Sequence, residues 1–386
     1  MGSLETKPGA ALGLYVHWPY CARICPYCDF NVRRDRGQDT GFLVEAMIAE
    51  IKQWAARIDT NQPLASISFG GGTPSRMEPT QLQKILQAAE HSFGFTSDIE
   101  ISLEANPTDQ DAARYEAFAQ MGVNRLSLGV QSFDDAQLAF LGRDHTAASA
   151  TRALALAQTH FDLVSADFIY GLPDQTGQQW QSALGDILTL ELSHLSFYCL
   201  SIEPGTAFSK WQQRGKLQPM PDDQTADLYD LTQTALGAAG MPAYEISNHC
   251  AGQANRSRHN LLYWQGDDWI GIGPGAHGRV KVNGRRHAVA NLRRPQDYAN
   301  HVQQDGLGAL ELESLSADDD LAERLMLGLR LPDGIGLDIM QSRAGAKLDA
   351  NRLARSLQAG TVRLEKGQLI ASSPLLVDRI ALDLLV

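Results

Sequence analysis

Three cysteine residues near the amino terminus have a spacing suited to metal chemistry. Cys21, Cys25 and Cys28 lie within eight residues, shortly after an apolar run. Thiolates gathered by one short loop suit a soft metal ion or an iron–sulfur cluster. Structural zinc usually has four protein ligands, and no second Cys-x-x-Cys pair follows. On a four-iron cluster, three cysteines leave one iron open to a small molecule. The alternatives are a zinc site completed by His17, or free thiols.

The first two thirds of the chain alternate between strand-like and helix-like apolar patterns, which must position this loop. Strand patterns occupy residues 12–17, 64–69, 98–104, 124–130, 162–169 and 194–200. Stretches with apolar residues at helical spacing lie between them. Six strand–helix units predict a parallel sheet with right-handed crossovers, and so an α/β fold with a partial (β/α)6 TIM-like barrel. The alternative is a doubly wound open sheet.

The pattern changes after residue 245. Residues 278–290 alternate around Asn283-Gly284, which is a strong signal for a two-residue hairpin. The acidic stretch 311–320 predicts the start of a helix, and the last residues predict two short strands and an amphipathic helix. We therefore expect three parts: a barrel at 1–245, a connecting segment at 246–310, and a smaller C-terminal α+β unit of winged-helix type at 311–386.

Composition and charge narrow the class of protein. The chain has 386 residues, and its 33 basic and 45 acidic residues give a formal net charge of −12. This charge argues against nucleic acid as the main partner. No run approaches the roughly 18–20 apolar residues that span a bilayer, and residues 1–13 lack the pattern of a secretory signal. Five cysteines are too few and too odd in number for a disulfide framework, so we expect a reducing, cytoplasmic location.

Polar and glycine residues recur where the expected strands end. The run Gly70–Thr73 follows the second strand, Glu104 ends the third, Gln131 follows the fourth, and Asp167 lies near the end of the fifth. The carboxyl ends of barrel strands share one rim, where chemistry gathers. Three successive glycines let a ligand approach the backbone closely. The sequence therefore predicts one site, formed by this rim and the cysteine loop.

The cysteine loop and several short motifs resemble those of a known protein family. The segment HWPYCARICPYCDF resembles the CxxxCxxC loop of the radical S-adenosylmethionine (SAM) superfamily. The motifs YVHWPYC, GGGTPS, EANP, RLSLGVQSF, DFIYGLP, IEPGT, YEISN and HNLLYW resemble the branch that contains oxygen-independent coproporphyrinogen dehydrogenases and HemW heme chaperones. The resemblance implies a 4Fe-4S cluster held by the three cysteines, with SAM on the open iron. It also implies a set of SAM-contacting positions: Tyr15, Tyr27, Gly71, Gly72, Thr73, Glu104, Gln131, Arg143 and Asp167.

Other roles exist for some of these positions. Glu104 and Asp167 could instead support the residues that contact the cofactor, or cap a helix. Arg143 could instead form an ion pair with its neighbour Asp144.

Two features separate the two branches. In the dehydrogenases the third cysteine begins a CxC sequence, whereas here Phe30 holds the position of the further cysteine. The segment from His259 to Trp264 matches the HNxxYW motif of the chaperones. By this resemblance His259, Tyr263 and Trp264 are expected to contact heme, with His259 as an axial ligand. A hydrogen-bonded structural histidine is the alternative.

Local charge also points to an anionic ligand. Residues 256–294 contain eight basic and two acidic residues, a local net charge of +6. Arginine suits the two propionates of heme, although a solvated hairpin face is the alternative. We expect a heme chaperone that delivers heme to acceptor hemoproteins, as a monomer or homodimer. A flavodoxin- or ferredoxin-type protein is the expected electron donor. The second hypothesis is an enzyme that cleaves SAM to a radical and oxidises a porphyrinogen; a zinc-bound regulatory protein is the third.

Overall fold

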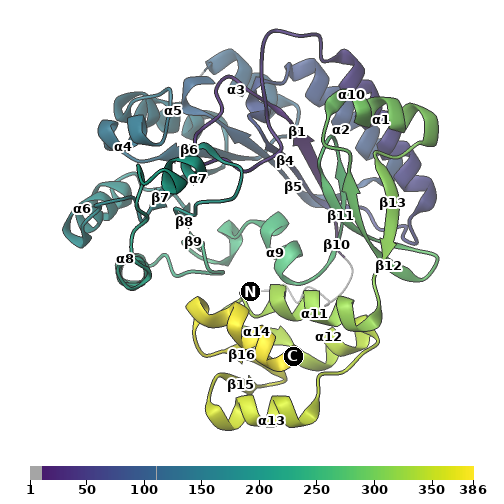
Figure 1. Ribbon diagram of the computed structural model, residues 1–386. Coiled ribbons are helices and arrows are strands. Elements are labelled where there is room, and N and C mark those ends of the chain that lie inside the picture. The colour runs from purple at the N-terminus through teal and green to yellow at the C-terminus, as the bar shows by residue number, and fades with distance from the viewer. Residues whose placement is uncertain (1–10, 110) are drawn as a thin grey trace.

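A curved sheet of eleven strands forms the centre of the molecule (Figure 1). The computed structural model describes residues 11–109 and 111–386. No secretory signal is found in the sequence of residues 1–13, and residues 1–10 of that segment lie outside the described range. The strand order is β13-β12-β11-β10-β1-β4-β5-β6-β7-β8-β9. In the described part of the chain, no helix has the length and apolar character needed to cross a bilayer.

All six predicted barrel strands are confirmed. Their observed bounds are β1 (Leu12–Trp18), β4 (Leu64–Gly71), β5 (Phe95–Ala105), β6 (Arg125–Gln131), β7 (Leu163–Tyr170) and β8 (His194–Cys199). The helices that follow them are α1 (Gly41–Arg57), α2 (Pro79–Phe93), α3 (Ala112–Gln120), α4 (Asp135–Phe140), α5 (Ala147–His160), α6 (Gly177–Leu188), α7 (Ala207–Gln213) and α8 (Asp222–Ala238).

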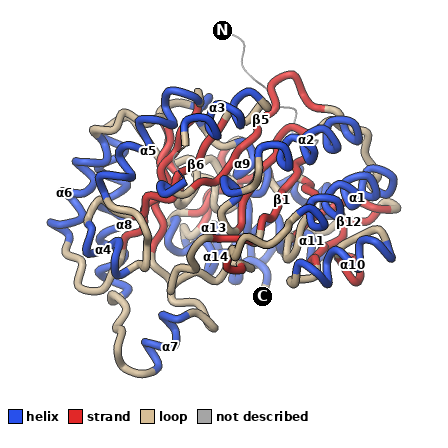
Figure 2. Tube along the Cα trace, turned by 90° about the horizontal axis from the view of Figure 1, so that it is seen from above, coloured by secondary structure: helices blue, strands red, loops and turns tan. Residues whose placement is uncertain are grey.

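The order of these strands decides between the two predicted architectures. Each pairs in parallel with the next one along the chain, from β1 to β8. A doubly wound sheet reverses its strand order at a switch point, and this row has no reversal. Helices α2, α3, α5 and α6 lie along the outside of the curved row (Figure 2). The fold is therefore a partial TIM-like barrel, and the carboxyl ends of the six strands share one edge.

Much of the predicted connecting segment, residues 246–310, extends this sheet. Strand β10 (Asp268–Ile272) pairs in parallel with β1, which adds a seventh parallel strand that the sequence pattern did not reveal. The predicted hairpin is confirmed, with Asn283 and Gly284 at φ angles of 50° and 76° in its turn. The added strands have these bounds: β9 (Asn248–Cys250), β11 (His277–Val282), β12 (Arg285–Asn291) and β13 (Ala309–Ser314). The three-part division of the chain remains a prediction.

A buried carboxylate fastens the added strands to the barrel. Glu50 of α1 is fully buried and accepts hydrogen bonds from the Gly308 backbone N–H (2.8 Å), the Asn291 amide (3.1 Å) and the Tyr298 hydroxyl. Tyr298 belongs to α10 (Pro295–Asp305). Burial raises the pKa of Glu50 to about 7 despite these donors. The Glu50 side chain thus connects α1 to β12, to α10 and to the loop before β13.

The C-terminal residues form a smaller unit with its own apolar core. Its core includes Leu321, Leu325, Met340, Leu369 and Ile380. The mixture of helices and a small sheet that the sequence predicts is present, with one further short strand. The elements are α11 (Ala317–Gly328), β14 (Ile335–Gly336), α12 (Leu337–Ala344), α13 (Ala350–Ala359), β15 (Val362–Glu365), β16 (Gln368–Ala371) and α14 (Val377–Leu385).

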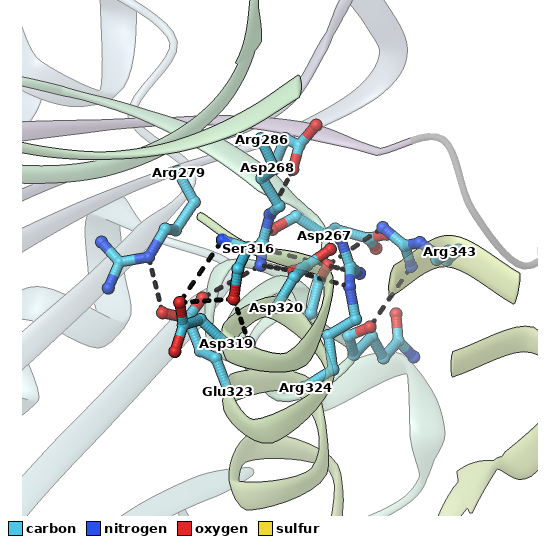
Figure 3. Close-up of polar contacts among 12 residues, drawn as sticks. Asp267, Asp268, Arg279, Arg286, Ser316, Asp319, Asp320, Glu323, Arg324 and Arg343 are labelled. Carbon is cyan, nitrogen blue, oxygen red and sulfur yellow. Dashed lines mark hydrogen bonds and ion pairs between the residues drawn. The ribbon is translucent and has the colours of Figure 1, made fainter. Parts of the chain in front are cut away.

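A buried ionic network joins this unit to the sheet (Figure 3). Arg286 of β12 pairs with Asp320 of α11 at 2.7 Å and with Asp268 of β10 at 3.0 Å. Arg324 pairs with the same Asp320 at 2.9 Å. The side chains of Arg286, Asp320 and Arg324 are 7% exposed or less. Because each charge has an oppositely charged partner, their burial is tolerated.

Arg324 and Arg343 of the C-terminal unit hold the end of a short helix that packs against β1 and β4. Helix α9 (Arg258–Trp264) carries the HNxxYW motif, and the chain turns at Gly266 just beyond it. The Gly266 carbonyl accepts hydrogen bonds from Arg324 (2.5 Å) and from Arg343 Nη2 (3.0 Å). Cations at the carboxyl end of a helix also favour its dipole. The C-terminal unit therefore fixes the position of α9.

We expect Asp320→Ala to lower the free energy of unfolding by about 3 kcal/mol or more, because it leaves the buried Arg324 without a carboxylate partner and removes one of the partners of Arg286. The matched control is Asp378→Ala, which breaks the Arg330 ion pair at a carboxylate 67% exposed. Its loss should cost less than about 1 kcal/mol. Urea denaturation of both variants measures the difference, and equal costs would contradict the structural role assigned to Asp320.

Candidate functional site

A cavity of about 400 Å³ opens at the carboxyl ends of the barrel strands. That volume lies in the usual range for small-molecule sites. The structure brings eleven of the twelve residues predicted for cluster and SAM binding into its lining: Cys21, Cys25, Tyr27, Cys28, Gly71, Gly72, Thr73, Glu104, Gln131, Arg143 and Asp167. The twelfth, Tyr15, lies behind the wall, near Gly70 and Glu104. Their exact contacts with a ligand remain predictions.

The cysteine loop is held by short local contacts. Strand β2 (Tyr20–Cys21) pairs with β3 (Arg33–Arg34), and the Cys28 N–H donates to the Cys25 carbonyl at 3.2 Å. All three thiols are free and line one cavity. Within residues 11–109 and 111–386, no three Cys, His, Asp or Glu side chains converge on a single-ion site. A four-iron cluster takes each thiolate on a different iron, so this donor set fits it.

The zinc alternative loses its proposed fourth ligand. His17 Nε2 lies 3.0 Å from the Asn31 carbonyl oxygen, and its Nδ1 lies 3.1 Å from the Tyr15 hydroxyl. Both ring nitrogens therefore already have hydrogen-bond partners. His17 serves the structure by tying β1 to the end of the cysteine loop.

Arg143 connects the cysteine loop to the strand ends. Its Nη1 donates to Cys25 Sγ at 3.4 Å, and its Nη2 donates to the Gly129 carbonyl at 2.9 Å. Its Nε is buried and has no hydrogen-bond partner among the described residues. These contacts favour a role in the cavity over an ion pair with Asp144. An unsatisfied buried donor beside a thiol is the kind of group that a bound cofactor satisfies.

Two glycines form a backbone cradle beside the thiols, in which neighbouring atoms leave no room for a side chain. Gly71 has a φ angle of 103°, and a Cβ there would lie 2.5 Å from His17 Cε1. A Cβ on Gly72 would lie 2.7 Å from the Tyr20 carbonyl oxygen and 3.0 Å from Cys21 Sγ. Only glycine fits both positions. Strand β4 therefore ends in backbone that lines the cavity beside the thiols, as the glycine run predicts.

Two carboxyl groups face the cavity from neighbouring parts of the rim. Glu104 accepts a hydrogen bond from the Gly71 N–H at 3.2 Å, and Asp167 accepts one from Ser127 Oγ at 3.1 Å. Burial, together with the nearby charge of Asp167, raises the pKa of Glu104 to about 7. Burial likewise raises the pKa of Asp167 to about 6. A cationic ligand would favour the ionised form of both groups.

Gln131 completes this edge in an unusual backbone conformation. Its φ angle of 68° lies in the left-handed region, which non-glycine residues rarely adopt. Such strain persists only where the surroundings impose it, and it gathers at functional sites. Gln131 also lies at the end of β6, where the cavity begins.

The residues predicted to contact heme lie outside this lining. His259 is buried, with Nδ1 at 2.8 Å from Ser66 Oγ and Nε2 at 2.7 Å from the Tyr263 hydroxyl. Burial lowers the pKa of His259 to about 3, so its ring is neutral at pH 7. Trp264 lies under the Arg330 guanidinium, at 5.7 Å from its ring centroid. Ligation of iron by His259 would require the loss of one of these hydrogen bonds. Heme contact by His259, Tyr263 and Trp264 remains a prediction.

Part of the basic segment has a different use from the one its charge suggested. Arg279 pairs with Glu323 at 2.6 Å, Arg258 pairs with Asp98 at 2.7 Å, and Arg286 is enclosed in the ionic network. Acidic residues from distant parts of the chain neutralise these three arginines, whereas no ion pair is formed by Arg285, Arg293 or Arg294 within the described residues. The sequence alone does not show these partners. Propionate binding by this segment remains a prediction.

Sequence reasoning missed part of the cavity edge. Ile24, Phe30, Tyr198 and Cys199 also line it, and all four are exposed. Cys199 lies far from the cysteine loop in sequence but ends β8 at the same rim. The motif order along the strands could have found Tyr198 and Cys199, whereas the exposure of Ile24 and Phe30 follows from the loop conformation.

Known proteins resemble the chain over most of its length. A family model described as the radical SAM superfamily matches residues 15–187. The heme chaperone HemW of Synechocystis sp. is 38% identical over 83% of this chain and 78% of its own, and that of Bacillus subtilis is 33% identical over 87% of each chain. The chain belongs to the radical SAM superfamily, among the relatives of HemW. The mitochondrial radical SAM domain-containing protein 1 of Mus musculus is also 40% identical, over 83% of this chain and 74% of its own.

A solved structure supports the fold of this radical SAM protein. Coproporphyrinogen III oxidase (HemN) from Escherichia coli matches with a TM-score of 0.79, covering 98% of this chain and 91% of its own. At 21% identity this likeness concerns the fold alone. The 4Fe-4S cluster and SAM predicted from the sequence are the cofactors of the superfamily, and the thiols, glycine cradle and carboxyl groups described above suit them.

Gly71→Ala should weaken SAM binding by about tenfold or more, equivalent to about 1.4 kcal/mol or more, because the new methyl group would collide with the His17 ring and displace the backbone that lines the cavity. The left-handed φ angle should also cost about 1–3 kcal/mol of stability. Gly177→Ala is the matched control, since a Cβ there meets nothing within 4 Å. Equilibrium dialysis with SAM compares the two variants, and equal affinities would exclude Gly71 from the binding site.

Proposed function

We propose that this radical SAM protein binds heme and delivers it to acceptor hemoproteins. The observation that carries the proposal is the identity of 33–38% to proteins named heme chaperone HemW over most of the chain. Phe30 adds support, because it is exposed at the cavity where the porphyrinogen-oxidising branch has a cysteine. Cytoplasmic location, a flavodoxin- or ferredoxin-type electron donor, and a monomeric or homodimeric state belong to the same proposal.

The residues of the rim have distinct roles in this proposal. Cys21, Cys25 and Cys28 hold the cluster, which when bound supplies an electron and an open iron for SAM. The Gly71–Gly72 backbone admits the amino-acid end of SAM, while Glu104 and Asp167 accept hydrogen bonds from its polar groups. Arg143 donates to Cys25 Sγ and so compensates the charge gathered by the thiolates.

The second candidate is an oxidoreductase that acts on a porphyrinogen. The fold shared with HemN and the complete SAM-binding rim favour it. It would use the same cofactors but would convert many substrate molecules per protein chain. A chaperone instead binds heme stoichiometrically and releases it chemically unchanged.

Anaerobic reconstitution should give about four iron and four acid-labile sulfide atoms per chain, because three thiolates can hold a four-iron cluster. Cys28→Ala should lose most of this content. Cys250→Ala is the control, since this thiol lies outside the cavity lining and contacts the Gly252 carbonyl. About one zinc per chain without sulfide would refute the cluster.

Heme titration and a coproporphyrinogen assay on one reconstituted sample separate the two candidate functions. We expect about one heme bound per chain, transfer of that heme to an apo-hemoprotein, and no decarboxylation of coproporphyrinogen when SAM and a reductant are present. Absorbance follows heme, and chromatography follows the porphyrins. Catalytic product formation would instead establish the oxidoreductase.

A further inference from the structure

Three large apolar or aromatic side chains in the cavity lining are exposed. Ile24, Phe30 and Tyr198 are 46%, 61% and 44% exposed, respectively, and all three line the same cavity. Single exposed apolar residues are common on protein surfaces. Three large ones around one opening, from two separate parts of the chain, indicate a surface that binds an apolar ligand.

Cationic groups border this apolar edge. Arg23 also lines the cavity, and the exposed Arg34 lies on β3, whose backbone pairs with that of Cys21. Neither guanidinium forms an ion pair within the described residues. Asp29 and Glu203 share the lining, so recognition here depends on individual guanidinium groups and not on net charge. A suitable ligand is therefore broad and apolar and carries carboxylates at its periphery.

The interior motif offers no comparable surface. His259 is 3% exposed, and both its ring nitrogens are hydrogen-bonded. A macrocycle that reached it would have to displace α9 from beneath β1 and β4. In contrast, the side chains of the cavity edge are accessible without any rearrangement.

We propose that the edge formed by Ile24, Phe30 and Tyr198 is the docking surface for the heme macrocycle, and that Arg23 and Arg34 bind its propionates. This inference rests on the proposed heme-binding function and assigns that function a location. Aromatic rings pack favourably on a flat conjugated ligand. Phe30 then serves as a packing surface at the position where the porphyrinogen-oxidising branch has a reactive thiol.

The apolar part of the proposal is tested by hemin titration of the full reconstituted chain. Phe30→Ser should weaken binding by about five- to tenfold, the effect of losing one aromatic contact. Leu376→Ser is the matched control, because Leu376 is 55% exposed but does not line the cavity. Iron and sulfide contents equal to those of the wild type show that the cysteine loop is intact in each variant. Equal heme affinities for Phe30→Ser and the wild type would overturn the proposal.

The charged part is tested with heme and its dimethyl ester, which lacks the two negative charges. The wild-type chain should bind heme more tightly than the ester, and Arg23→Gln should reduce this preference by about threefold or more. Arg355→Gln, on the exposed face of α13, should leave the preference unchanged. An unchanged preference in Arg23→Gln would remove Arg23 from the site. A wild-type chain that binds no heme would instead overturn the proposed function itself.

Discussion

The common direction of the parallel strands is the constraint on which the site depends. Because β1 and β4 to β8 run the same way in sequential order, their carboxyl ends meet at one edge. Residues as distant in sequence as Cys21 and Asp167 therefore line one cavity. A strand that entered the sheet in the opposite direction would carry its polar end away from the thiols. The strand topology thus determines which residues can meet in the site, and the individual side chains then determine its chemistry.

Charge has two separate uses in the molecule. At the cavity, Glu104 and Asp167 lie half-buried and face space that a cationic cofactor suits. On the opposite side of α9, the buried carboxylate of Asp320 binds two guanidinium groups and joins two units of the chain. Burial makes both arrangements costly unless a partner is present. In the ionic network the partners of the carboxylate are arginines of the same chain. At the cavity the expected partner of the two carboxylates is a bound cationic ligand.

Much of the fold could be predicted from sequence because local signals were strong. Strands β4 and β7 are largely buried and mostly apolar, with Ser66, Ser68, Ser165 and Asp167 as exceptions, and Asn283-Gly284 specifies its own turn. Strand β10 was missed because it is short, contains Gly271, and is defined by pairing with a distant strand. The cavity residues were predictable, since motif spacing places them at strand ends. The partners of Arg286 and the enclosure of His259 depend on tertiary contacts, which spacing does not encode.

The hydrogen bonds at Gly266 have a consequence for the order in which the molecule is completed during synthesis. The Gly266 carbonyl is bound by Arg324 and Arg343, which lie 58 and 77 residues later in the chain. The cysteine loop and all six strand ends of the rim, by contrast, lie before residue 200 and are synthesised well before Arg324. The rim can therefore assemble on the nascent chain while α9 still lacks its final contacts. A chain that stops short of Arg324 would keep the cavity residues but leave the HNxxYW helix unanchored.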